Sequence, residues 1–556
     1  MRIPFLSDRH CENISPFTSM KSYLSSHLHP KQCRRSGNQT SCLPHAIELE
    51  HVDEGNRRSY VAHRVPAFYT PVYSPRFVYG CVLSASIGGI LFGYDTGIIS
   101  SALVVFYRDL GHDLSREEKQ LLTSLTSGGA FIGALIAALT TDAIGRKMVI
   151  GLGCIWFTVG SVLASSAYSV ALMSIARFII GVGMGLETMV TPIYISELSP
   201  SSRRGRMITV YSLAVTGGQA LAYAIGSIFN LVSQGWRYMF AFGAIPALIQ
   251  VALFPIYPET PRHLIYRNQT ADAIMVLQQI YPQAPPSDIQ TLVQTIQDDV
   301  NRSVSFDQGI RRACWSWKQL HTVPSHLRSL ITACGLMALQ QLSGFNSLMY
   351  YSATLFNIMG FSKPIEAGLI VSGTNFIFTA LSLKFVDLGR RRLLIGTVWG
   401  LPVALAMAAG AFSKINIDTN LELVATPPLW AKVLAIISFA VFVAFYAIAL
   451  GNVPWLANEF LALEVRAVGT AMLTMVCWSS NILVSATFLS LVSAISASGA
   501  FGLYAGVCFV GWVFIIFTYP ETAGLGLESV RQVFEHGFGV RYANQLQGLR
   551  WIDAAL

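Results

Sequence analysis

Residues 142–147 read DAIGRK, a short charged segment between two long runs without any charged residue, 120–141 and 148–176. A similar segment, DLGRRR at residues 387–392, precedes the uncharged run 393–413 in the second half of the chain. A membrane-spanning helix needs about 20 apolar residues to cross roughly 30 Å of hydrocarbon. The spacing therefore predicts that each segment is a tight, charged turn between two membrane-spanning helices.

Two further charged motifs recur in the same order in both halves. ELSPSSRRGR begins at Glu197 and is matched by EFLALEVRAVG from Glu459, and PETPR from Pro258 is matched by PETAG from Pro520. Three motifs that recur in order, two of them at the same offset of 262 residues (Glu197 to Glu459 and Glu259 to Glu521), indicate an internal duplication. The sequence therefore predicts two related bundles of six helices.

The composition independently indicates a membrane protein. Of the 556 residues, 53% are hydrophobic and only 12% are charged, which is typical of a polytopic membrane protein. Seven uncharged runs are each long enough for one span: 120–141, 148–176, 207–236, 238–258, 329–362, 393–413 and 433–458. Two more spans contain Asp95 and Arg177, one lies between Glu366 and Lys384, and two fit within the uncharged run 467–520. We predict an all-α polytopic membrane protein with twelve transmembrane helices in two pseudosymmetric six-helix bundles.

These runs divide the chain into five segments. We predict a disordered tail, an amino-terminal bundle, a polar linker, a carboxy-terminal bundle and a second tail, at residues 1–76, 77–258, 259–326, 327–520 and 521–556. The first tail has no apolar run that could act as a signal peptide. Its histidines and the nine cysteines of the chain lack the spacing of a zinc site, so no metal site is predicted.

Basic residues predict the orientation, because lysine and arginine accumulate on the cytoplasmic side of a membrane. With both termini in the cytoplasm, the external loops hold few of the 38 basic residues, namely Arg108, Arg116, Lys119, Arg237, Lys363, Lys414 and Lys432. Both termini are therefore predicted to be cytoplasmic. The formal net charge of +8 needs no nucleic-acid partner to explain it.

One acid interrupts the first span. Asp95 lies in LFGYDTGIIS, within a segment that is otherwise uncharged from Phe77 to Tyr107. A charged side chain at the bilayer centre costs about 3 kcal/mol on insertion scales, so such an acid usually has a partner and a function. Arg177 lies at a similar depth in the fourth span, and we predict that the two side chains pair. A permanent structural ion pair is the alternative.

From about residue 76 to residue 530 the chain resembles the sugar porter branch of the major facilitator superfamily. The resemblance depends on GYDTGIISSALV, PIYISELSPSSRRGR, PETPRHLI, QQLSGFN and PETAGLGLE. It implies two bundles around a central substrate cavity and short interfacial helices in the linker. It also implies that Asp95 carries a coupling proton, because facilitative members usually have a neutral residue there.

Polar side chains inside the predicted spans are candidates for binding an uncharged polyol. Gln and Asn offer both a donor and an acceptor, and an aromatic ring suits the CH face of a sugar. At positions that match the family pattern these residues are Gln219, Gln340, Gln341, Asn346, Tyr350, Asn375, Trp455, Trp478 and Asn481. Each could instead bond only a neighbouring helix.

The seventh span is predicted to be broken. Gln341 and Asn346 would lie about 140° apart on a straight helix, so they could not easily contact one ligand. Ser343 and Gly344 lie between them, and a break there would turn both side chains inward.

The charged loop motifs are predicted to form ion pairs that hold the two halves together when the protein faces outward. The alternative is that they only determine topology. Their residues are Asp142, Arg146, Glu197, Arg204, Glu259, Arg262, Asp387, Arg390, Glu459, Arg466 and Glu521.

In GNVPWLANEF, Glu459 lies four residues after Trp455, a spacing that resembles fungal inositol transporters rather than many other sugar porters. The interpretation is a secondary transporter that carries myo-inositol or a related polyol with H⁺ as coupling ion. It is expected to act as a monomer in the lipid bilayer, in the plasma membrane, without a cofactor.

Two alternatives remain: a facilitative or proton-coupled hexose transporter, and a nutrient sensor that signals without transport. No nucleotide-binding or metalloprotease motif indicates an enzyme. The chain departs from the family pattern at Ser212, Ala462 and Ala523, and it has extra charges at Glu187 and Lys384.

Overall fold

The computed structural model describes residues 47–52, 59–64, 73–200, 203–304, 310–385, 389–415, 417–418, 423–462, 464–522 and 532–545. The chain divides into two compact units, Met1–Tyr69 and Thr70–Leu556. In the first unit, strands β1 (Ile47–Val52) and β2 (Ser59–Arg64) pair antiparallel, with Ile47 opposite Arg64. This strand pair lies within the segment predicted to be a disordered tail.

The second unit begins with six long helices: α2 (Pro75–Val105), α3 (Arg116–Ile144), α4 (Arg146–Ser165), α5 (Val170–Leu198), α6 (Arg204–Phe229) and α7 (Gly235–Leu253). Their boundaries follow from local sequence. Ser115 and Glu118 form a reciprocal capping box at the start of α3, and Ser169 caps α5 by accepting from the backbone N–H of Leu172.

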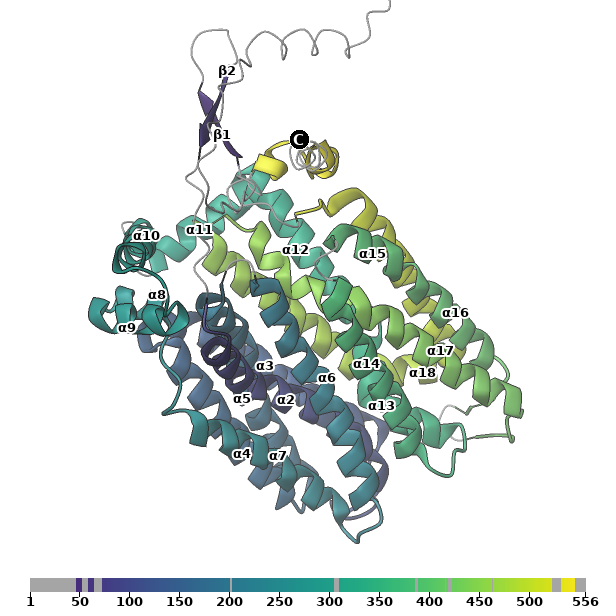
Figure 1. The fold of residues 1–556 in the computed structure, drawn as a ribbon. Coiled ribbons are helices and arrows are strands. Elements are labelled where there is room, and N and C mark those ends of the chain that lie inside the picture. The colour runs from purple at the N-terminus through teal and green to yellow at the C-terminus, as the bar shows by residue number, and fades with distance from the viewer. Residues whose placement is uncertain are drawn as a thin grey trace, which may run out of the picture. The chain divides into compact units, whose positions relative to one another are not determined.

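Four shorter helices follow: α8 (Pro261–Tyr266), α9 (Thr270–Ile280), α10 (Pro286–Val304) and α11 (Ile310–Thr322). In α9, Ala273, Val276, Leu277 and Ile280 are buried on one face, which is the spacing of an amphipathic helix. Figure 1 shows these four helices at one end of the long helices. We call this the linker end.

The second group consists of α12 (Pro324–Leu342), α13 (Phe345–Ile358), α14 (Pro364–Phe385), α15 (Arg390–Val398), α16 (Gly400–Phe412), α17 (Leu429–Phe445) and α18 (Arg466–Thr518), with a π-helical turn at Tyr446–Leu450 and a 3₁₀ segment at Val453–Phe460. It lies beside the first group (Figure 1). A single helix of 53 residues would be far longer than a bilayer is thick. Helix α18 is in fact broken at Ile495 and Ser496.

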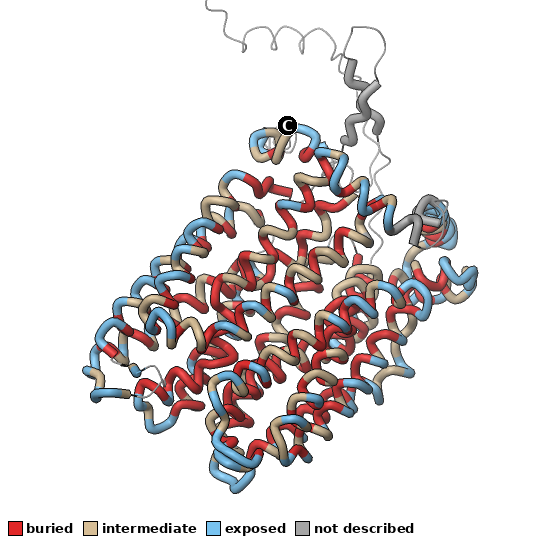
Figure 2. Tube along the Cα trace, turned by 180° about the vertical axis from the view of Figure 1, so that it is seen from behind, coloured by how far each residue is buried: buried red, intermediate tan, exposed pale blue. Residues whose placement is uncertain are grey.

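The prediction of twelve spans is confirmed. Ten segments of the described residues are long and apolar enough to cross a membrane. One of them, Val468–Thr518, contains the break in α18 and therefore supplies two spans, and α12 with α13 supplies the twelfth. Buried residues line the interior of the helix layers, and exposed ones lie on the outer faces (Figure 2). Several exposed side chains are large and apolar, among them Leu139, Ile228, Val510 and Phe517, as expected where helices face lipid.

Candidate functional site

Asp95 and Arg177 form an ion pair in the interior of the first bundle, as predicted. An oxygen of Asp95 on α2 accepts a hydrogen bond from Nη1 of Arg177 on α5, and both side chains are buried. Arg177 also donates from Nε to the carbonyl of Leu122 at 3.1 Å, and its guanidinium lies 5.9 Å from the centre of the Phe240 ring. The charge of Arg177 is thus held among α2, α3, α5 and α7.

The seventh span is broken where the sequence predicted. Helix α12 ends before Ser343, and α13 begins after Gly344, which has φ of 86°. This positive φ favours glycine. The break brings the two amides together, and Nδ2 of Asn346 therefore donates a hydrogen bond to Oε1 of Gln341.

Five of the predicted substrate residues form one hydrogen-bonded group, which we call the amide cluster: Gln340, Gln341, Asn346, Tyr350 and Asn481. Asn481 donates to Oε1 of Gln341 at 2.9 Å, and its own Oδ1 accepts from Tyr350 at 3.2 Å and from Ser127 at 2.6 Å. Gln341 donates to Gln340 at 3.2 Å, and Gln340 donates to two backbone carbonyls at 2.9 and 3.0 Å. All five side chains are buried.

The remaining four predicted substrate residues lie outside this group. Asn375 on α14 donates to Gln219 on α6 at 2.7 Å, which makes a second amide pair. Trp478 is buried edge-on to Phe92, with ring centroids 5.7 Å apart, and its Nε1 has no hydrogen-bond partner among the described residues. Trp455 is half-buried against the apolar core, and no hydrogen bond joins it to the amide cluster in the described part of the chain.

Several hydrogen bonds join the two bundles, and most of them involve residues that the sequence did not single out. Ser127, which bonds Asn481, is one of them. Further examples are Tyr223 to the carbonyl of Met349 at 2.7 Å, the N–H of Ala353 to Ser100 at 3.1 Å, Ser490 to Gln120 at 2.8 Å, and Thr474 to the sulfur of Met189 at 3.3 Å. Serine and tyrosine are too common in spans to mark such contacts in advance. Ser100, Gln120, Ser127 and Tyr223 all lie in the half of their helices that is farther from the linker end.

The charged motif residues of the first bundle contact one another. Arg146 lies 3.3 Å from Glu197 and 2.9 Å from Asp142. Glu259 accepts from the backbone N–H of Lys147 at 3.0 Å. These contacts join the starts and ends of α3, α4 and α5 to the segment after α7.

The second bundle repeats this arrangement. Arg390 pairs with Glu459, and Glu521 accepts from the backbone N–H groups of Arg390 and Arg391 at 3.2 and 3.0 Å. Gly145 and Gly389 have φ of 99° and 125°, and an added Cβ would lie 2.4 Å from Glu259 or 2.9 Å from Glu521. Glycine is therefore required in both turns for conformation and for space.

These ion pairs lie within each bundle, whereas the sequence-based interpretation had them hold the two halves together. Arg146 and Arg390 each pair with a glutamate of their own bundle, because each arginine begins a helix that lies beside that glutamate. The remaining motif residues are also local: Arg204 donates to the carbonyl of Ser196 at 3.1 Å, and Arg466 donates to that of Leu461 at 3.0 Å. Arg262 is half-buried in α8, and Asp387 lies outside the described residues.

Burial changes the titration of two groups at the linker end. It raises the pKa of Glu259, and hydrogen bonds from the N–H groups of Thr260 and Lys147 partly offset this. Burial and the nearby Arg146 lower the pKa of His263, whose Nδ1 lies 3.4 Å from Nη1 of that arginine. A neutral imidazole is favoured here because the arginine is itself a donor.

The departures from the family pattern fall in different environments. Ser212 is buried in α6, Ala462 is half-buried, and Lys384 is exposed in the last turn of α14. Ala523 lies outside the described residues. Glu187 is fully buried in α5.

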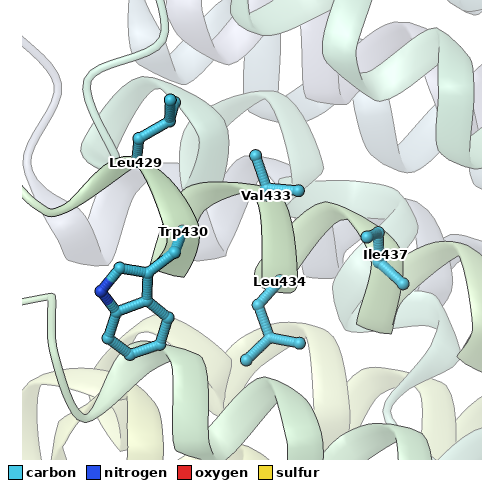
Figure 3. A pocket seen from close by; sticks show the side chains of 5 residues that line it. All are labelled: Leu429, Trp430, Val433, Leu434 and Ile437. Carbon is cyan, nitrogen blue, oxygen red and sulfur yellow. The ribbon is translucent and has the colours of Figure 1, made fainter.

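An apolar hollow lies on α17, lined by Leu429, Trp430, Val433, Leu434 and Ile437 (Figure 3). Most of these side chains are exposed, and only the indole N–H of Trp430 could bond a hydroxyl. Such a surface suits lipid chains and does not suit a polyol.

Comparisons with known proteins agree with these features. A family model described as "Sugar (and other) transporter" matches residues 81–534. Myo-inositol transporter 1 of Cryptococcus neoformans var. grubii is 42% identical over 485 residues, covering 86% of this chain and 85% of that protein. Myo-inositol transporter 2 of Schizosaccharomyces pombe is 41% identical over 457 residues, covering 82% and 81%. The proton:xylose symporter XylE bound to 6-bromo-6-deoxy-D-glucose matches with a TM-score of 0.71 at 24% identity, over 83% of this chain and 100% of that one, which indicates a common fold.

Proposed function

The chain belongs to the sugar (and other) transporter family, and from this premise we propose that it carries myo-inositol or a closely related polyol into the cell together with a proton. Two relatives that are 42% and 41% identical to it over the aligned residues are named myo-inositol transporters. The single observation that supports proton coupling is the buried pair of Asp95 and Arg177. A buried acid beside a permanent cation is either ionised and attracted to that cation or protonated and neutral, so it can bind and release a proton.

Helix α2 connects this pair to the other bundle. Asp95 and Ser100 lie about one and a half turns apart on α2, and Ser100 accepts from the N–H of Ala353 on α13. Protonation of Asp95 weakens its attraction to Arg177, so α2 can shift relative to α5. That shift would change the contact between the bundles, which is how proton binding and substrate access become linked.

The amide cluster and the Gln219–Asn375 pair are proposed to bind the polyol. Both contain neutral donors and acceptors at the contact between bundles, where alternating access would open first to one side and then to the other. We further propose that the protein acts as a monomer in the plasma membrane with both termini in the cytoplasm, so that the linker end is cytoplasmic.

The test is uptake by the purified protein in liposomes under an inward proton gradient. A panel of labelled myo-inositol, other cyclic polyols, glucose and xylose is offered, and the external pH is recorded. Accumulation of myo-inositol with external alkalinisation is expected, and a protonophore should abolish it. Accumulation of hexose alone would favour the hexose alternative, and binding of a ligand without uptake would favour a sensor.

A further inference from the structure

Glu187 is a second intramembrane acid, and it has no cationic partner. Its side chain is 1% exposed. Oε1 accepts a hydrogen bond from Sγ of Cys154 on α4 at 2.9 Å, and no lysine, arginine or histidine of the described residues forms an ion pair with it. An unpaired carboxylate is very unfavourable in such surroundings, so the acid is stable there only when it carries a proton.

The neighbouring helices leave space for this carboxyl group. An added Cβ on Gly88 of α2 would lie 1.9 Å from Oε2, and one on Gly153 of α4 would lie 2.7 Å from Cγ of the glutamate. Glycine at both positions therefore accommodates the side chain. The packing of α2 and α4 therefore provides a specific site for this carboxyl group.

The polar groups around Glu187 are only partly satisfied. The side chains that face it are Thr191 on α5, Tyr211 on α6 and Gln250 on α7, together with Cys154. Gln250 and Thr191 lie close enough to interact with the carboxyl group of Glu187, but Oγ1 of Thr191, Oη of Tyr211, both amide atoms of Gln250 and Oε2 of Glu187 form no hydrogen bond of normal geometry with the described residues. Buried polar atoms are normally satisfied, often by ordered water, so this group is suited to hold water. The ionisable groups that face the acid are Cys154 and Tyr211, because Gly88 and Gln250 present none.

Gln250 also connects this group to the linker end. It lines a pocket of about 30 Å³ together with Ser84, Lys147, Tyr194 and Tyr257, which is enough space for one or two water molecules. Lys147 is in the first turn of α4, and Tyr257 follows α7, so the pocket lies towards the linker end.

Glu187 lies between this pocket and the Asp95–Arg177 pair. On α2, Gly88 precedes Asp95 by about two turns, or roughly 10 Å. On α5, Arg177 precedes Glu187 by about 15 Å at 1.5 Å per residue. Both offsets place Glu187 on the linker side of the pair.

We propose that Glu187 is a second proton-binding site of the first bundle and that it exchanges its proton with water at the linker end through the pocket beside Gln250. Water in the pocket carries the proton as hydronium to Oε2 of the carboxylate, and the resulting carboxylic acid later returns the proton to water. Only the role of this exchange in a transport cycle rests on the proton-coupled function proposed above.

Infrared difference spectra of the reconstituted protein test the site itself. The C=O stretch of a protonated carboxyl group should be present in the wild type, should change as the pH is stepped upwards, and should disappear in Glu187→Gln. It should persist in Asp95→Asn and in Glu117→Gln, a control that removes an exposed carboxylate. A spectrum in which Glu187→Gln removes no such band, or a band that does not respond to pH, would overturn the proposal.

Transport measurements test the exchange. Glu187→Gln should lower net proton-driven uptake at least tenfold and leave exchange of labelled for unlabelled substrate within about twofold of the wild type, because exchange does not require proton release. Gln250→Met keeps a side chain of similar volume but removes the amide that lines the water pocket, and it should slow net uptake in the same way. Wild-type net uptake in both variants would refute the exchange. A wild type that carries no substrate would instead refute the proposed function and leave the infrared result standing.

Discussion

Replacing Asp95 by Asn separates a proton carrier from a structural ion pair. The carboxylate is 3% exposed and its partner Arg177 is fully buried. Asn can still accept a hydrogen bond from Arg177, so the change replaces a charged acceptor by a neutral one. Arg177 stays charged, however, and losing the partner of a buried charge costs about 3–5 kcal/mol when nothing replaces it. The bond that the amide can still accept from Arg177 is a bond to a charged group and contributes about 1.5–3 kcal/mol. The expected loss of stability is therefore about 1–3 kcal/mol, and the amount of inserted protein shows whether the fold survives it.

The loss of coupling should be much larger. One proton that enters across 100 mV releases about 2.3 kcal/mol, and a gradient of one pH unit adds about 1.4 kcal/mol. Together they can support an accumulation of a few hundredfold. Without a proton on residue 95 this driving force no longer acts, and accumulation should fall to the external concentration.

The assay is uptake of labelled substrate in liposomes with an imposed potential and pH gradient, together with counterflow and the amount of inserted protein. Asp95→Asn should lose accumulation and retain counterflow. The matched control is Asp113→Asn, which removes the carboxylate of an exposed pair with Arg108 and should behave as the wild type. A well-inserted Asp95→Asn variant that still concentrates substrate would refute the proton-carrier role, and loss of insertion with loss of counterflow would favour the structural ion pair.

Three further predictions test other parts of the structure. Gln341→Ala and Asn346→Ala should each weaken substrate binding about tenfold or more in equilibrium binding assays, because an unpaired buried amide costs about 1–3 kcal/mol; unchanged affinity in both would remove these residues from the site. Gly145→Ala should lower the thermal unfolding temperature because φ there is 99°, whereas Gly396→Ala, with no neighbouring atom within 4 Å, should not; equal effects would contradict the steric argument. Because the folded protein lowers the pKa of His263 below its ordinary 6.5, stability should be full above about pH 6.5 and fall as the pH is lowered through that value; a thermal-shift titration should show less of this loss in His263→Gln, and an equal loss would refute it.

The spans could be predicted because the cost of placing a charge in hydrocarbon exceeds most other energies in the chain. The break in the seventh span could also be predicted, because Gly344 allows a positive φ and two amides five residues apart needed to meet. The break in α18 could not be located. Ile495 and Ser496 lie there. Serine is common in turns, but it also occurs at Ser490, Ser493 and Ser498, so tertiary packing must determine which position breaks.

Partners of charged and polar groups were harder to predict than the groups themselves. Arg146 and Arg390 were recognised, but Coulomb attraction depends on distance, and the fold places each beside a glutamate of its own bundle. Ser127 gave no signal at all, although it bonds Asn481 across the bundle contact. Such contacts depend on the positions of two helices that are far apart in sequence.

The bonding of the amide cluster has a consequence for affinity. Gln341 and Asn481 already satisfy each other, so a polyol hydroxyl that enters must replace an existing hydrogen bond with a new one. The net gain for each exchange is small, since even a complete intramolecular hydrogen bond contributes only about 0.5–1.5 kcal/mol. Affinity then depends on how many hydroxyls can be satisfied at once, and a ligand that lacks one hydroxyl leaves an amide unpaired. Discrimination among polyols can therefore be strong while binding stays weak enough for release on the far side.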